Sequence, residues 1–175
     1  MEVYRLYDAL EKGTYKSRGF TEFEIRERGK VRHIKSVHIT ERVVQKCLCN
    51  YGLIPLIFPT LIYDNGASQK GKGIHFSRQR LEKHLRQHYA KHGSEGYILK
   101  FDFKKYFDNI PHDVVINQIN KLDLDEKTKR LAAYLIKQNP GDVGLGIGAE
   151  ISQVLAISYA NPIDHYIKYR LQIKR

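Results

Sequence analysis

Apolar and polar residues alternate most clearly in the run YILKFDF, residues 97–103. Side chains at every second position of an extended chain share one face. The apolar face then holds Tyr97, Leu99, Phe101 and Phe103. The opposite face holds Ile98, Lys100 and Asp102. This pattern predicts a strand that packs its aromatic face on helices and leaves Asp102 on the open face near its end.

Helical spacing of apolar residues dominates the rest of the chain and predicts a helix-rich α+β fold. A short amphipathic helix is expected at about 2–11, and another after Thr40, its candidate N-cap. FSRQRLEKHLRQHYAKHG predicts a helix that stops at Gly93. Further helices are expected from Pro111, over DEKTKRLAAYLIKQNPG, and over 150–171, where Pro162 should introduce a kink.

Two segments between the predicted helices have other patterns. FTEFEIRERGKVRHIKS contains two β-prone runs around a turn near Gly29 and predicts a hairpin. YDNGASQKGKG is rich in glycine and polar residues and predicts a loop.

Charge narrows the class of partner. The net charge is +11, and basic residues are concentrated in 66–92, where they face a single acid, Glu82. These basic residues are Lys70, Lys72, Arg78, Arg80, Lys83, Arg86 and Lys91. Such a field attracts phosphate backbones, although a basic surface that only keeps the protein in solution has the same composition.

Other features exclude several classes. No apolar run approaches the roughly 20 residues of a membrane span, and the first segment lacks the apolar core of a signal peptide. Cys47 and Cys49 are too close on a predicted helix for an ordinary disulfide, and core packing suits them better than metal binding. A reducing cytoplasm is the expected location.

The segment KFDFKKYFDNIPH, residues 100–112, carries the strongest chemical signal. A carboxylate at the end of an apolar strand suits a divalent cation, because magnesium prefers hard oxygen ligands. The alternative is an edge strand with a polar tip.

KFDFKKYFDNIPH also resembles the first catalytic motif of reverse transcriptases, especially the bacterial retron, group II intron and diversity-generating types. GKVRHI at 29–34 with ITERVVQ at 39–45 resembles their fingers motif, and SQKGKGIHF at 68–76 resembles the template-contacting segment. GIGAEISQVLAISYANPIDHY at 146–166 resembles the glycine loop and helix that follow. The four motifs occur in the order of the family.

The resemblance implies a role for individual residues. Asp102 matches the first catalytic, metal-binding aspartate, with the Phe103 carbonyl as a second ligand. The residues that match nucleotide-binding positions are Lys30 and Arg32 for the triphosphate, Phe107 as the gate against a 2′-hydroxyl, and Gly148 and Ser152 as supports. Those expected to bind nucleic acid are Lys70, Lys72 and Arg78. The implied partners are an RNA template, a DNA primer and deoxynucleoside triphosphates, with two Mg²⁺ ions as cofactor.

Three departures from the family pattern matter. Ile147 stands where many members have glutamine, and Gln153 replaces the commoner proline, as in the diversity-generating and some unclassified bacterial branches. No Asp–Asp pair occurs in the sequence, whereas two-metal catalysis needs carboxylates from a second motif. The expectation is an N-terminal fragment, inactive alone, with fingers at 1–95 and a partial palm at 96–175 that ends before the Asp–Asp hairpin and lacks a thumb.

Competing interpretations remain open. A non-catalytic RNA-binding module on the polymerase scaffold is the main alternative. Gly144-x-Gly146-x-x-Ala149 with Asp164 fits a dinucleotide-binding pattern, although no strand is predicted before it. The three histidines at helical spacing, His84, His88 and His92, could bind zinc. The uncovered edge of the predicted strand 97–103 further predicts weak homodimerisation.

Overall fold

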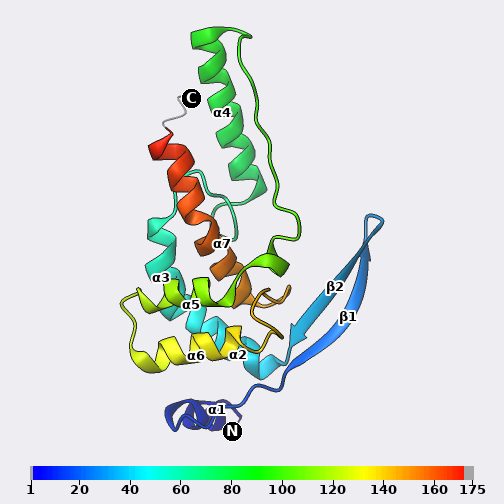
Figure 1. Ribbon diagram of the computed structural model, residues 1–175, viewed down its shortest axis with the longest axis vertical. Coiled ribbons are helices and arrows are strands. Elements are labelled where there is room, and N and C mark those ends of the chain that lie inside the picture. The colour runs from blue at the N-terminus through cyan, green and yellow to red at the C-terminus, as the bar shows by residue number, and fades with distance from the viewer. Residues whose placement is uncertain (1, 172–175) are drawn as a thin grey trace.

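Helices make up most of the protein, and the one sheet among residues 2–171, which the computed structural model describes, is a two-stranded hairpin (Figure 1). The fold is therefore mixed α+β, with helix outweighing strand as expected. The N-terminal half contains α1 (Glu2–Glu11), β1 (Phe20–Glu27), β2 (Lys30–Val37), α2 (Ile39–Cys47), the π-helix η1 (Leu48–Leu53), α3 (Ile54–Ile57), the 3-10 helix η2 (Phe58–Thr60) and α4 (Ile74–His92). The C-terminal half contains the 3-10 helix η3 (Phe107–Asn109), α5 (His112–Asn120), α6 (Glu126–Ile136), α7 (Glu150–His165) and the π-helix η4 (Tyr166–Arg170).

The hairpin forms as the sequence predicts. Its strands are antiparallel, and Glu27 lies opposite Lys30 across a two-residue turn. Arg28 and Gly29 occupy this turn with φ values of 48° and 77°. Positive φ at both central residues suits the right-handed twist of the strands, which explains the turn at this glycine.

Helix ends follow local chemistry, with one correction. Gly93, with φ of 64°, ends α4 as predicted. Thr40 is not the N-cap of α2: the cap is His38, whose Nδ1 accepts a hydrogen bond from the Thr40 backbone N–H at 3.3 Å. The imidazole nitrogen thereby satisfies one of the free N–H groups in the first turn of the helix.

The hydrophobic core lies between α2, η1, α5, α6 and α7. Its largest fully buried residues come from five segments of the chain: Leu53, Ile110, Ile119, Ile136 and Leu155. The core therefore joins residues from both sides of position 95, where the sequence predicted a boundary between fingers and palm. In Figure 1, α4 projects from this body at one end, and α1 lies at the other.

Pro162 lies inside α7 and has no N–H to donate to the carbonyl of Ser158, four residues earlier. Gln118 on α5 compensates for this loss. Its Nε2 lies 3.5 Å from the Ser158 carbonyl, and the Ser158 hydroxyl donates back to Gln118 Oε1 at 3.2 Å. Past the proline, the α-helix gives way to the π-helix η4 at Tyr166.

The prediction of a strand at 97–103 is wrong. These residues run extended beside α4 without regular secondary structure, and all of them are exposed (Figure 1). A strand requires a hydrogen-bonded neighbour. The only two strands among the described residues, β1 and β2, pair with each other. Alternation is present in the sequence, but no pairing partner lies among the described residues.

None of the helices between residues 2 and 171 combines the length and apolarity that crossing a membrane requires.

The two cysteines should differ sharply in reactivity. Cys47 is exposed, whereas Cys49 is fully buried, and burial raises the pKa of its thiol to about 12. Because the thiolate is the reactive form, we expect a disulfide reagent to modify one thiol of the folded protein rapidly at neutral pH. The second should react only in denaturant. The reagent releases a chromophore for each thiol that it modifies. Fast release of two equivalents per native protein would contradict this assignment.

Candidate functional site

The glycine loop before α7 lies against the end of the hairpin. The backbone N–H of Lys35 on β2 donates to the Ile147 carbonyl at 3.2 Å. Gly148 has φ of 113°, and a Cβ there would lie 3.0 Å from the Lys35 carbonyl oxygen. Glycine is therefore required twice at this position, for its backbone conformation and for the close approach of β2.

A third segment joins the same loop. The Leu145 N–H donates to the Phe107 carbonyl at 2.8 Å, and the Gly144 N–H donates to the Ile110 carbonyl at 2.9 Å. His112 Nε2 lies 2.6 Å from the Gly144 carbonyl. Residues that are far apart in sequence, at the end of β2, at 107–112 and at 144–148, thus converge through backbone hydrogen bonds.

A small cavity of about 230 Å³ opens where these segments meet. Its charged and polar lining residues are His33, Lys35, Asp108 and Asn139. Sequence reasoning missed all four. The hairpin alternation places His33 and Lys35 on one face of β2, but the pattern contains no sign that this face contacts the glycine loop.

The expected nucleotide-binding residues are only partly brought together. Gly148 lies at the junction, and Ser152 is buried in the first turn of α7. Lys30 and Arg32 are exposed near the hairpin turn, and Arg32 lies 3.5 Å from Glu27. The hairpin projects from the body of the protein, so that these two cations lie toward its free end (Figure 1).

Asp102 is exposed on the extended segment, and the aromatic residues after it lead back to the core. The ring of Phe103 lies 5.5 Å from that of Tyr106, which lies 5.9 Å from Phe107. The Tyr106 hydroxyl donates to the Ala156 carbonyl on α7 at 2.7 Å, and burial raises its pKa to about 12. Tyr106 therefore anchors this segment to α7, whereas Asp102, four residues earlier, stays exposed.

The expected magnesium ligands, Asp102 and the Phe103 carbonyl, do not form a complete metal site with their surroundings. Within residues 2–171, no three side chains of His, Cys, Asp or Glu gather closely enough to hold a metal ion. Asp102 and the Phe103 carbonyl alone cannot hold two metal ions. The two-ion centre expected in the complete enzyme therefore stays a prediction.

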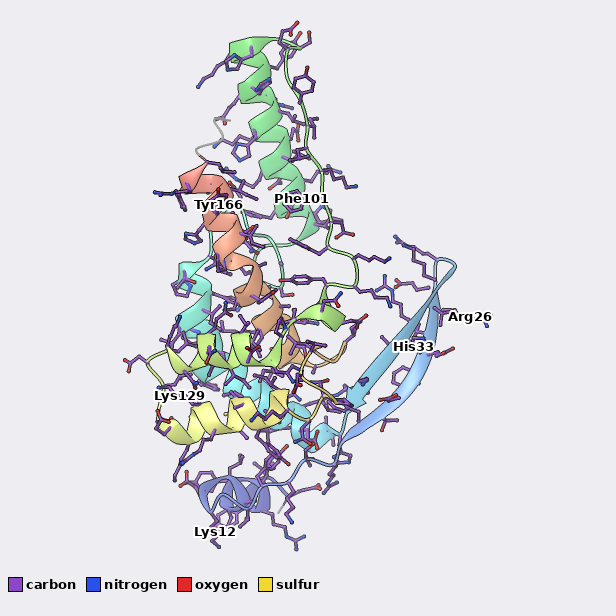
Figure 2. The ribbon with its side chains drawn as sticks, in the orientation of Figure 1. Lys12, Arg26, His33, Phe101, Lys129 and Tyr166 are labelled. Carbon is purple, nitrogen blue, oxygen red and sulfur yellow. The ribbon has the colours of Figure 1, made fainter. Side chains whose placement is uncertain are left out.

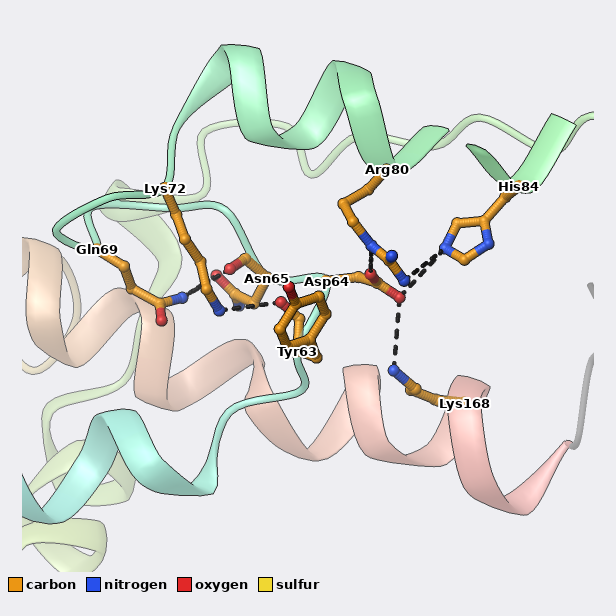
Figure 3. A network of polar contacts seen from close by, with 8 residues as sticks. All are labelled: Tyr63, Asp64, Asn65, Gln69, Lys72, Arg80, His84 and Lys168. Atoms are coloured by element: carbon orange, nitrogen blue, oxygen red, sulfur yellow. Dashed lines mark hydrogen bonds and ion pairs between the residues drawn. The ribbon is translucent and has the colours of Figure 1, made fainter. Parts of the chain in front are cut away.

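Among the expected nucleic-acid ligands, Lys70 and Arg78 are exposed, whereas Lys72 has a structural role (Figure 3). The Lys72 ammonium group donates to the Tyr63 carbonyl at 2.9 Å. It also lies 5.2 Å from the ring centroids of both Tyr63 and Phe76. Lys72 therefore holds the loop 61–73 against the start of α4.

Asp64 lies at the centre of a charged network that fixes α4 to the body (Figure 3). One carboxylate oxygen accepts from Arg80 Nε at 2.5 Å. The other lies 3.4 Å from His84 Nε2 and 3.5 Å from Lys168 Nζ. Because these groups are mostly buried, the carboxylate offsets positive charge from both α4 and η4.

The structure also places the residues of the weaker motifs. His84 contacts Asp64, and His88 Nε2 lies 2.7 Å from the carbonyl of Glu95 in the loop after α4. The glycines Gly144 and Gly146 follow α6 and a turn rather than a strand, contrary to the context that dinucleotide binding requires.

A larger groove of about 670 Å³ lies between α2 and the start of α7. Arg42, Asn50 and the exposed Tyr51 contribute polar and aromatic groups, and Gly148 lies at its edge. The glycine loop therefore borders both the groove and the small cavity.

Comparison with known proteins finds no matching family model and no matching curated protein.

Proposed function

We propose that this chain forms the fingers (1–95) and the first part of the palm (96–175) of an RNA-directed DNA polymerase. The order of the four motifs supports this assignment. The observation that carries it is the convergence of β2, the segment after Asp102 and the glycine loop, which are three of those motifs, around Gly148. A cytoplasmic location belongs to the same proposal.

Each part of this arrangement would have a task in nucleotide binding. Lys30 and Arg32 would neutralise the triphosphate of a deoxynucleotide, since a guanidinium group offers paired donors to phosphate oxygens. Phe107 would crowd a 2′-hydroxyl. Asp102 and the Phe103 carbonyl would contribute oxygen ligands to magnesium, which would reach the site with the triphosphate.

Nucleotide binding tests this function. We expect the Lys30→Ala/Arg32→Ala variant to bind a magnesium–deoxynucleoside triphosphate at least about tenfold more weakly, because each charge-assisted hydrogen bond contributes roughly 1.5–3 kcal/mol. Isothermal titration calorimetry measures the affinity. The control, Arg5→Ala/Lys12→Ala, removes one positive charge from α1 and one from the residue after it, away from the hairpin turn. Equal affinity of the hairpin variant and wild type would reject the proposal.

A nucleic-acid-binding module without catalysis is the second candidate. The exposed side chains of α4, which include several of the basic residues of 66–92 and the aromatic Tyr89, favour it. Phosphate neutralisation and base stacking are the two interactions through which proteins bind single strands.

Salt dependence measures this binding. If about five phosphates of a single-stranded RNA are neutralised, log affinity should fall against log salt with a slope near −3.5, at roughly 0.7 per contact. Lys70→Ala/Arg78→Ala should reduce the slope to about −2. Lys72 is a poor test because its replacement would loosen the loop at Tyr63. Fluorescence anisotropy supplies the affinities, and a slope unchanged in the double variant would rule out these contacts.

A further inference from the structure

Within residues 2–171, the backbone of the extended segment 97–103 has no hydrogen-bonding partner. No backbone hydrogen bond to these seven residues is found among those of the described chain. Their side chains are exposed as well: Leu99 is 84% exposed, and Phe101 is 58% exposed. Such an edge can pair with another strand.

The segment already has the side-chain arrangement of a strand. The rings of Phe101 and Phe103, two residues apart, pack edge to face at a centroid distance of 5.9 Å, as expected for side chains on one face. Lys100 and Asp102 then belong to the other face. Figure 2 shows Phe101 on the chain that runs beside α4, away from the core helices.

We propose that the segment pairs antiparallel with the same segment of a second copy, about a twofold axis at Phe101. In this register Phe101 lies opposite Phe101, and Leu99 lies opposite Phe103. Lys100 of each copy lies opposite Asp102 of the other, which forms two equivalent ion pairs. Aromatic pairs and opposite charges on facing positions both stabilise antiparallel strands.

Other registers are poorer. A twofold axis at Lys100 would place the two ammonium groups opposite each other. A twofold axis at Asp102 would place the two carboxylates opposite each other. A shift by one residue would mix the apolar face with the charged face. The charge pattern of the segment is therefore complementary to itself in one register, which identifies a second copy as the occupant of this edge.

The net charge of +11 on each copy opposes association. At about 0.15 M salt, charges farther apart than roughly 8 Å are largely screened, whereas facing side chains are not. The five residues 99–103 that pair in this register bury less than the roughly 800 Å² per partner of a standard interface. We therefore expect a dimer that forms in the micromolar range.

Charge exchange tests the pairing. Lys100→Asp and Asp102→Lys each place like charges opposite each other, so each should weaken the dimer at least about tenfold. The double variant K100D/D102K restores opposite charges and should recover wild-type association. Sedimentation velocity over about 5–300 µM protein covers the expected range. A wild-type protein that stays monomeric throughout this range, or a double variant that fails to recover, would overturn the proposal.

Net charge alone predicts a different ranking of these variants by dimer affinity. Lys100→Asp lowers the formal charge from +11 to +9 (11 − 2), which would strengthen association if general repulsion were decisive. The matched control is Lys91→Asp on α4, with the same charge change outside the segment. It should associate at least as well as wild type, and a loss equal to that of Lys100→Asp would refute specific pairing.

Cross-linking tests the register. In a Cys47→Ser background, Phe101→Cys places two cysteines opposite each other, with Cα atoms about 4.5–5.5 Å apart, within the range of a disulfide. Leu99→Cys faces Phe103 and should cross-link poorly. Equal cross-linking of both variants under mild oxidation would exclude this register. Pairing is measured here without nucleotide, and nucleotide binding is tested through Lys30 and Arg32, outside the segment, so either test can fail without the other.

Discussion

Replacing Leu155 with alanine is expected to lower the free energy of unfolding by about 3 kcal/mol. Leu155 is fully buried in α7, and this helix packs against α2, η1 and α5. The loss combines the transfer energy of the removed atoms with the cavity that remains, because the surrounding helices close it only partly. Urea denaturation followed by circular dichroism measures the change.

The matched control is Leu81→Ala on α4, where the same side chain is 55% exposed. An exposed leucine leaves no cavity, so the loss should stay below about 1 kcal/mol. Similar losses for the two variants would show that α7 does not organise the core as described.

Replacing Gly148 with alanine is expected to destabilise the protein by about 1–3 kcal/mol and to weaken nucleotide binding. The added Cβ would lie 3.0 Å from the Lys35 carbonyl oxygen. The backbone φ of 113° is also one that residues with a side chain rarely adopt. The glycine loop or β2 would have to move, which separates the hairpin from the loop that supports the proposed nucleotide site. Thermal unfolding and nucleotide titration together report both effects.

Gly13→Ala isolates the effect of the backbone conformation. Gly13 also has a positive φ, 67°, but a Cβ there would meet no atom within 4 Å. This variant should lose a smaller amount of stability and keep nucleotide affinity. If Gly13→Ala impaired binding as much as Gly148→Ala, the loss would reflect general destabilisation rather than the contact with Lys35.

Local chemistry explains the parts of the fold that were predictable. The turn at Arg28–Gly29 and the end of α4 at Gly93 both depend on glycine adopting positive φ within a few residues. The amphipathic spacing of α1 and the extent of α4 likewise follow from short-range periodicity. Such features involve neighbours in sequence, so a pattern along the chain contains the necessary information.

The candidate site was predictable only in part. The resemblance to reverse transcriptases implied Gly148 and Ser152, and the structure places them just before α7 and in its first turn. Lys72 was expected at a nucleic-acid surface, yet its ammonium group contacts the Tyr63 carbonyl. Charge in a sequence indicates an attraction to anions, but it does not distinguish a phosphate from a backbone oxygen of the same protein.

Periodicity along the chain is sufficient to predict the helices, the hairpin and the alternating faces of 97–103, because these depend on residues two to four positions apart. The packed structure was needed to show that 97–103 has no pairing partner among the described residues and that Lys35, Phe107 and the glycine loop meet. A strand needs a partner from elsewhere in the chain, and a cavity needs walls from several segments. Both depend on how the buried helices pack against one another, which periodicity within a single segment does not encode.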